Sequence, residues 1–335
     1  MAPKPDRLVL RNGVVYSPSK PKATAVVIDR GEVVWLGGER ALTKQIADDD
    51  QVIDVDGAIV APSFCDAHRK AFGANDASTL MGREDGIGAA HMFPIIAGRG
   101  STVDERMGRW LQVPSRPQAA AKPTHGIGLL AEHALTTIDA VKDHLAEAFE
   151  ADVSAVFSIT PTIDLKISIA GCKAWNEEYA EAPPVRFDGL ARATPAELKA
   201  LAKLDASIVF DGHRVDPSVA ASAVRHGISI AFGSFGSQLD PWLWLRKVVA
   251  GASGGKKKGK SAGLSALDGF AAVTSGGWRV AGMKEKADLV VGSRVPLALW
   301  RIEGDSALLP DLTNVDQLPQ WVASVVDGNY NPRTK

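Results

Sequence analysis

Two successive helix-then-strand units, followed by a third helix start, constrain the fold of this chain more than any other feature. Helices are expected to begin after Thr194, Asp216 and Asp240, because each of these capping residues precedes a proline. Between the helices lie the short apolar segments 207–210 and 227–233. Apolar strands that alternate with helices are typical of a parallel sheet covered by helices. The sequence therefore predicts an α/β fold.

The preceding segment continues this pattern. Residues 153–159 and 165–170 are apolar enough to be two further strands, and 136–151 has the spacing of an amphipathic helix. Residues 70–124 contain glycines and prolines with weak periodicity, so we assign no elements there. The apolar stripe of the predicted helix consists of Ile138, Val141, Leu145 and Phe149.

The N-terminal sixty residues show a different pattern of short strands and turns. Asn12-Gly13 is typical of a hairpin turn and follows the apolar segment 7–11. Residues 25–28 and 32–37 flank a second turn, Asp29-Arg30-Gly31. Such elements are expected of a small antiparallel sandwich. Further strand-like segments are 51–55, 286–292 and 297–301.

Composition and charge limit the expected partners and compartment. Of the 335 residues, 45% are hydrophobic and 23% charged, and the net charge is −1. This balance supplies no global field that would attract nucleic acid or an anionic membrane. No segment resembles a signal peptide or a membrane span, and Cys65 and Cys172 cannot form a disulfide framework. We therefore expect a cytoplasmic protein. The Gly- and Lys-rich segment 251–263 is expected to be a solvated loop, with an acidic partner or nucleic acid as the alternative.

The most specific motif is DVDGAIVAPSFCDAHRK, residues 54–70. It resembles the opening of the amidohydrolase superfamily, where the pattern is DGxxVxPGFxDxHxH. In that family the two histidines alternate along one strand, face the mouth of a barrel and bind a divalent metal ion. Here His68 occupies the first position and Lys70 the second. A protonated lysine has only donors and cannot be a metal ligand.

Later stretches resemble, in the same order, the long subgroup of this superfamily that includes N-substituted formamide deformylases. His125 opens the sequence HGIG, which resembles a HAIG motif whose histidine binds metal. Residues 185–190 stand where the subgroup has RIEH, and Gly189 occupies the position of the second metal-binding histidine. In residues 230–236, Phe235 stands at the position of an aspartate that activates water. Further matches are 194–198, 239–242, 272–282 and 287–289.

The resemblance implies an α/β fold with two parts. Residues 61–283 are expected to form a shortened TIM-like (β/α) barrel, and residues 1–60 with 284–305 a composite β-sandwich. Residues 306–335 are left as a C-terminal extension. A complete barrel needs about 200 residues or more, so this one could lack strands and expose sheet edges. We therefore expect a homo-oligomer or a protein partner, with the basic residues 254–260 and the segment 241–244 as candidate contacts.

Metal-dependent hydrolysis needs three or four ligands, an open position for water and a carboxylate that handles the proton. Of the family positions, His68 and His125 retain a metal-binding group. Lys70, Gly189 and Phe235 do not supply the expected one. Two neutral histidines would hold zinc poorly. His68 is instead expected to hydrogen-bond Asp66 or a backbone carbonyl, and a similar role is expected for His125.

Other residues offer alternatives. His213, together with Asp211 at the end of a predicted strand, could replace the lost ligands, although a solvated loop histidine is the simpler interpretation. Lys70 could be an amine for Schiff-base chemistry. Cys65 lies three residues before His68, on the opposite face, and is expected in the core. Asp188 precedes Gly189 by one residue and is expected to point away from the site.

These residues lead to three functional hypotheses. The favoured one is a degenerate amidohydrolase, without a confident catalytic residue, that has lost its metal ion and acts by binding or scaffolding. The alternative is an active hydrolase of C–N bonds with a rearranged site for zinc or another divalent ion, in the simplest case for a single ion. A third is a metal-free binder of an unknown small molecule.

Overall fold

The computed structural model divides the chain into two compact units. The first holds Met1–Phe64 and Met283–Lys335, together with the short piece Gly82–Ala90, and the second holds Cys65–Met81 and His91–Gly282. The structure describes residues 7–71, 89–97, 110–113, 126–131, 135–159, 163–237, 240–250, 263–284, 287–302, 309, 312 and 318–333. Within these residues, no helix is long and apolar enough to cross a membrane.

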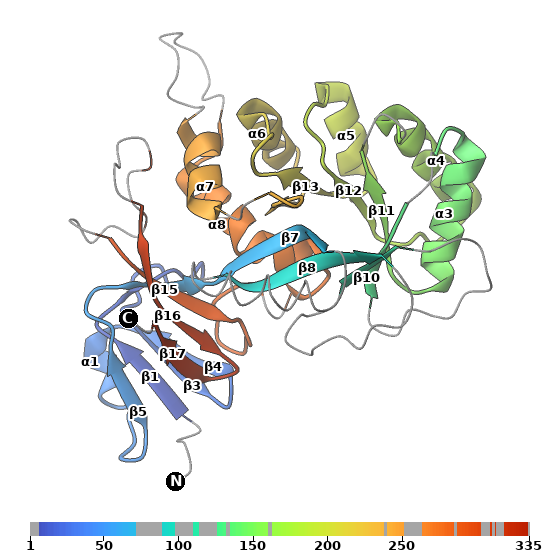
Figure 1. Ribbon diagram of the computed structural model, residues 1–335. Helices are drawn as coiled ribbons and strands as arrows, with labels where there is room; N and C mark the ends of the chain where they lie inside the picture. Colours follow the sequence, from blue (N-terminus) through green and yellow to red (C-terminus); the bar gives the residue numbers. More distant parts are fainter. Residues whose placement is uncertain are drawn as a thin grey trace. The chain divides into compact units, whose positions relative to one another are not determined.

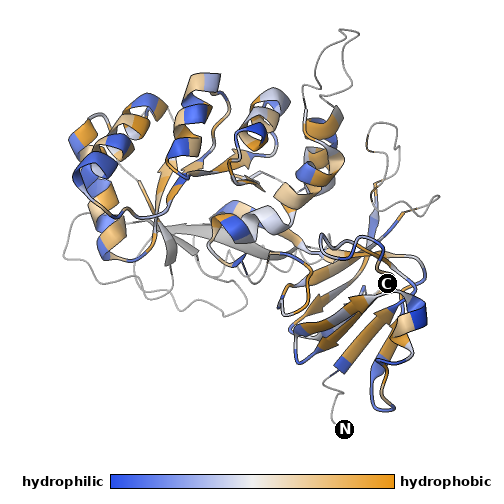
Figure 2. Ribbon diagram, turned by 180° about the vertical axis from the view of Figure 1, so that it is seen from behind, coloured by the Kyte–Doolittle hydropathy of each residue, from blue (hydrophilic) through white to orange (hydrophobic). Residues whose placement is uncertain are grey.

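The first unit contains two sheets and a short helix, α1 (Glu39–Leu42). The four-stranded sheet has the order β4 (Glu32–Gly37), β3 (Ala25–Asp29), β1 (Arg7–Arg11) and β5 (Gln51–Asp54). The five-stranded sheet has the order β17 (Asn329–Pro332), β16 (Gln320–Val326), β15 (Leu297–Arg301), β6 (Ile59–Pro62) and β2 (Val14–Val15). Both sheets contribute to one buried apolar cluster, and their strands are largely hydrophobic in Figure 2. The sandwich arrangement itself stays a prediction.

The hairpin predicted at Asn12-Gly13 is wrong. Asn12 does adopt the left-handed turn conformation, with φ 57°. However, β1 pairs with β3 and β5, whereas β2 pairs with β6 in the other sheet. The turn therefore carries the chain from one sheet to the next, and the backbone N–H of Val14 donates to Ala58 instead of to β1. The second predicted hairpin, β3 with β4, is confirmed as an antiparallel pair.

The C-terminal region differs from the sequence-based expectation in two ways. Residues 287–292 form turns instead of a strand, and Ser293 closes one of them with its backbone N–H on the carbonyl of Val290. The segment 306–335, left as an extension, contributes β16 and β17 to the five-stranded sheet, where β16 pairs with β15. The signal for β16 was the strand-favouring composition of QWVASVV, which contains one tryptophan and three valines; Ala323 and Val325 are its buried residues.

The second unit is built on an eight-stranded sheet whose strands follow chain order (Figure 1). All the pairings recorded from β8 to β14 are parallel. The strands are β7 (Phe64–Ala71), β8 (Ala89–Ala97), β9 (Trp110–Val113), β10 (Gly126–Leu130), β11 (Ser154–Ser158), β12 (Val185–Asp188), β13 (Ser207–Asp211) and β14 (Ile230–Gly233). Thus the region without assigned elements, 70–124, supplies β8 and β9.

Helices follow the later strands and lie along one side of them (Figure 1). The helices are α3 (Ile138–Glu150), α4 (Leu165–Glu178), α5 (Pro195–Lys203), α6 (Pro217–Arg225), α7 (Pro241–Ala250), α8 (Ala266–Val273) and α9 (Ser275–Val280). The starts predicted for α5, α6 and α7 are confirmed, and α5 has a full capping box between Thr194 and Glu197.

Two helix assignments from the sequence need correction. Residues 165–170, interpreted as a strand, begin α4, because the side chain of Asp164 accepts hydrogen bonds from the N–H groups of Lys166 and Ile167. In α3, Ile138 and Phe149 are each 44% exposed. The buried face of α3 keeps Val141 and Leu145 from the predicted stripe and adds His144 and Ala148.

The first and last strands of the eight-stranded sheet meet. The N–H of Phe235, just after β14, donates to the carbonyl of His68 on β7 at 2.9 Å. A Cβ added to Gly233 would lie 2.6 Å from the Cβ of His68, so glycine permits this approach. Seven strand spacings in a flat sheet would separate β7 from β14 by about 34 Å. The sheet is therefore strongly curled, as the predicted barrel requires, and its closure by a β7–β14 ladder stays a prediction.

His144 gives the second unit a defined acid sensitivity. Its ring is 7% exposed and meets Phe157 edge-on, and burial lowers the pKa of His144 from 6.5 to about 4. Because the unfolded chain takes up the proton first, the free energy of unfolding should fall below pH 6.5, by about 3 kcal/mol at pH 4. The free energy of unfolding of His144→Leu, measured in urea at pH 7 and at pH 4, should lack this decrease. His226→Leu, at a half-buried histidine, is the control. An equal decrease in the free energy of unfolding in wild type and His144→Leu would contradict the role of His144.

Candidate functional site

A buried polar cluster joins β7 and β12 in the second unit. The Nδ1 atom of His68 lies 2.6 Å from Oδ2 of Asp188. Arg186 donates from Nε to Oδ1 of Asp188 at 2.6 Å and from Nη2 to Oδ2 at 2.8 Å. The same Nη2 also donates to the carbonyl of Ala67 at 2.5 Å. All three side chains are at most 1% exposed, so the cluster is fully enclosed by the protein.

The end of β14 joins this cluster through Asp66. Oδ1 of Asp66 accepts from the backbone N–H groups of Ser234 at 2.9 Å and His68 at 3.2 Å. Arg69 donates to the hydroxyl of Ser234 at 2.9 Å and to the carbonyl of Ser237 at 2.5 Å. The His68 ring was expected to bond Asp66 or a backbone carbonyl, but it bonds Asp188, and only the backbone N–H of His68 donates to Asp66.

Burial and pairing set the protonation states. Burial lowers the pKa of His68 below its ordinary value, although the Asp188 carboxylate acts in the opposite direction. Burial would raise the pKa of Asp188, but the Arg186 guanidinium and the His68 contact outweigh it, and the pKa of Asp188 is lowered. His68 is therefore a neutral imidazole that donates its Nδ1–H to a carboxylate. Burial raises the pKa of Asp66.

The three family positions His68, Gly189 and Phe235 come together. The ring of Phe235 stacks on the imidazole of His68, with centroids 3.7 Å apart and an interplanar angle of 10°. A Cβ at Gly189 would lie 3.4 Å from the Phe235 ring. The sequence motifs thus identify neighbouring positions correctly, but an aromatic ring and a glycine stand where the family has a carboxylate and a histidine.

The described residues do not fit a divalent metal ion. Nowhere in the described part of the chain do three His, Cys, Asp or Glu side chains come together as a possible ligand set. At His68, Nδ1 is engaged by Asp188, one face of the ring is covered by Phe235, and Arg186 adds a fixed positive charge. Nε2 of His68 is buried and has no partner among these residues. A single nitrogen is too small a donor set for zinc.

The other candidates make different contacts or lie outside the described residues. Nε2 of His213 accepts from the Trp244 indole at 3.2 Å, and its backbone N–H donates to Asp211 at 2.9 Å. The carboxylate of Asp211 also faces Arg214 at 3.7 Å. His125 and the side chain of Lys70 lie outside the described residues.

Sequence reasoning missed the role of Arg186 and Asp188. The prediction that Asp188 points away is wrong, because β12 ends at Asp188 and Gly189 follows with φ +76°, which breaks the strand alternation. Arg186 and Asp188 are two apart and share one face of the strand. The signal was there in VRFD: two opposite charges alternate within a strand whose four residues are all buried. Cys65, expected in the core, is 2% exposed.

Comparison with solved structures gives the fold a name. A mutant of atrazine chlorohydrolase from Arthrobacter aurescens TC1, complexed with zinc and atraton, superposes with a TM-score of 0.69 over 96% of this chain and 94% of that one, at 14% identity. An amidohydrolase from a Sargasso Sea sample gives 0.70 over 97% and 92%, at 12% identity. The chain has the amidohydrolase fold.

A third structure with the amidohydrolase fold extends the comparison. N-isopropylammelide isopropylaminohydrolase from Burkholderia multivorans superposes with a TM-score of 0.65 over 97% of each chain, at 13% identity. No family model and no curated protein matches the sequence. At these identities the likeness is one of fold, so the function must be argued from the residues of the site.

Asp188→Asn is expected to lower the free energy of unfolding by about 3 kcal/mol or more, because it leaves the buried Arg186 without its counter-charge. The matched control is Asp211→Asn, at the end of the neighbouring strand β13, whose partner Arg214 has an 83% exposed side chain. That exposed pair should contribute less than about 1 kcal/mol. Urea unfolding at neutral pH measures both, and equal losses would contradict the structural role of Asp188.

Proposed function

We propose that this chain is an amidohydrolase-like protein that has lost metal-dependent hydrolysis and acts by binding or scaffolding. The observation that carries the proposal is the Phe235 ring, which stacks on His68 and lies beside Gly189. In the family to which the motifs point, these positions supply the metal ligands and the carboxylate that activates water. Here they supply one imidazole, an aromatic ring and a glycine.

The chemistry of the site supports this proposal. A metal ion activates water by lowering its pKa from about 15.7 to about 7, and it must be held in an open coordination site. A carboxylate must then handle the proton of that water. The carboxylate nearest to the His68 ring, that of Asp188, is already bound by Arg186 and His68. The described residues therefore offer no ligand set of three, and the carboxylate that contacts the His68 ring is already paired.

One observation favours the alternative, an active hydrolase of C–N bonds with a single metal ion. Metal-binding histidines commonly donate one ring N–H to a carboxylate, which orients the other nitrogen toward the metal. The pair of His68 and Asp188 has this arrangement, with Nε2 buried and unpartnered among the described residues. Such a site would need His125, and His213 if the mouth rearranges, to hold zinc or another divalent ion.

Elemental mass spectrometry on untagged protein, purified without chelator, separates the two functions. We expect well below one metal ion per chain, before and after incubation with excess zinc. Zinc uptake should rise in Phe235→Asp, which removes the ring and adds a carboxylate beside His68, but not in Phe235→Leu, which only removes the ring. Near-stoichiometric zinc, manganese or iron in the wild type would overturn the proposal in favour of the hydrolase.

We also propose that the scaffolding role involves a second copy of the chain, within a closed barrel and composite sandwich as in the subgroup that the motifs resemble. The contacts first expected are revised, because Trp242 and Trp244 are buried, at 5% and 2% exposure, and the basic residues 254–260 lie outside the described part. Within the segment 241–244, Leu243 of α7 stays a candidate contact, and Leu267 of the packed helix α8 joins it, because these apolar side chains are 47% and 51% exposed.

Light scattering coupled to size-exclusion chromatography tests this assembly. The wild type should elute with the mass of at least two chains, each of 35.4 kDa. Leu243→Asp should shift the mass toward that of one chain, because a charge cannot be buried without a partner. Ile138→Asp, at a similarly exposed position of α3, should leave the mass unchanged. A monodisperse monomer in the wild type would rule out self-association.

A further inference from the structure

A cavity lies at the opposite end of β14 from the His68 cluster. Its volume is about 280 Å³, and Ile230, the first residue of β14, lies in its lining. Gly233, the last residue of the strand, touches His68. Three residues of strand separate these two by about 10 Å, so the cavity is distinct from the candidate functional site.

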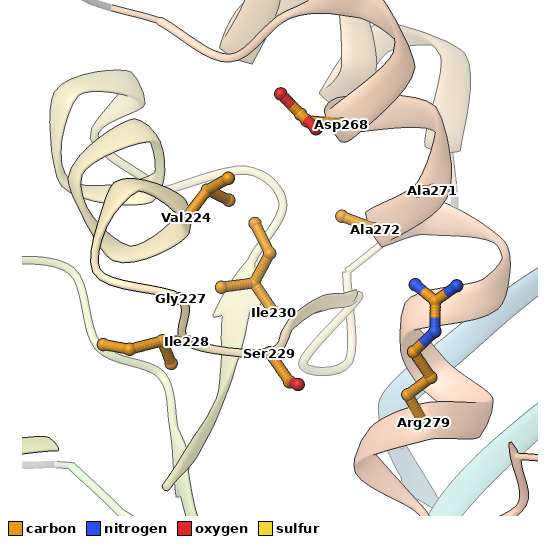
Figure 3. A pocket seen from close by; sticks show the side chains of 9 residues that line it. All are labelled: Val224, Gly227, Ile228, Ser229, Ile230, Asp268, Ala271, Ala272 and Arg279. Carbon is orange, nitrogen blue, oxygen red and sulfur yellow. The ribbon is translucent and has the colours of Figure 1, made fainter. Parts of the chain in front are cut away.

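The cavity has apolar walls on two sides (Figure 3). Val224 of α6 and Ile230 form one side, and Ala271 and Ala272 of α8 form the other. The small alanine side chains keep the space between α6 and α8 open. The volume is close to the lower end of the range for small-molecule sites, about 300–1,000 Å³. The space therefore suits a small ligand with an apolar body.

Two opposite charges stand at different ends of the α8 wall (Figure 3). Asp268 lies in the first turn of α8, and its Oδ2 accepts from the Ser265 hydroxyl at 2.6 Å, which fixes the carboxylate. Arg279 belongs to α9, and Figure 3 shows it on the other side of Ala272 from Asp268. Asp268 and Ala272 are four residues apart, a rise of about 6 Å along the helix. Ala272 therefore lies between the two charged residues along this wall (Figure 3).

We propose that this cavity binds a short apolar peptide with free ends, two or three residues long. Its ammonium group would pair with Asp268 and its carboxylate with the guanidinium of Arg279, while its side chains pack between α6 and α8. An extended chain spans about 3.3–3.6 Å per residue, so two residues cover about 7 Å. In a single amino acid both charges sit on one carbon and cannot reach both ends. The site is independent of whether His68 binds a metal ion.

Isothermal titration calorimetry on the full chain tests the ligand, with valyl-valine as the probe. We expect saturable binding of valyl-valine, and at least tenfold weaker binding of both its N-acetylated and its C-amidated forms. Free valine should bind at least tenfold more weakly as well. No binding of valyl-valine at millimolar concentration, or equal binding of the blocked forms, would overturn the proposal.

Two charge-removing variants locate the binding. Arg279→Gln and Asp268→Asn should each weaken binding of valyl-valine at least tenfold, and Asn at position 268 retains an acceptor for Ser265. Ala271→Leu should abolish binding by filling the space. Arg192→Gln, at an exposed arginine just after β12, is the matched control and should bind like the wild type. Thermal unfolding confirms that each variant is folded, and unchanged affinity in both charge-removing variants would overturn the proposal.

Discussion

The carboxylate of Asp188 is the centre on which the interior of the second unit depends. It accepts from Arg186 on its own strand and from His68 on β7. In the strand order β7 and β12 are five positions apart, which would be about 24 Å in a flat sheet. A 2.6 Å contact between them is possible only because the sheet curls. Three ionisable groups are buried together, and their mutual pairing is what makes such burial tolerable.

The same cluster limits the chemistry of the site. The Asp188 carboxylate and one Arg186 nitrogen are used to join β12 to β7, and one face of the imidazole is covered by an aromatic ring. A fold that supports hydrolysis in other proteins can thus be kept by interactions that need no bound ion. This agrees with the general rule that function resides in particular residues and not in the fold that carries them.

Much of the second unit could be predicted because local signals there agree with the final structure. The caps at Thr194, Asp216 and Asp240 and the apolar strands between them identify α5 to α7 with β13 and β14. The errors arose where a contact between residues far apart in the sequence determines strand pairing or side-chain direction.

The turn dipeptide at Asn12-Gly13 is present, but pairing with β6 places β2 in another sheet. Likewise, motif matching placed Gly189 and Phe235 beside His68 correctly. The inward direction of Asp188 depends on a left-handed glycine after the strand, which a simple alternation rule does not anticipate.

The pairing of β6 with β15 has a consequence for how the protein folds during its synthesis. Leu297 pairs with Pro62, so 235 residues (297 − 62) separate the partners along the chain. At a synthesis rate of about 5–20 residues per second, β6 waits roughly 12–47 s on the ribosome for β15. During that interval the apolar side chains of Leu8, Val26 and Val60 lack the partners that come from the C-terminal part of the chain, among them Leu297, Leu299 and Val325. Only a chain translated to its last strands can bury them, so a prematurely ended copy carries an exposed hydrophobic surface that marks it for chaperones and proteases.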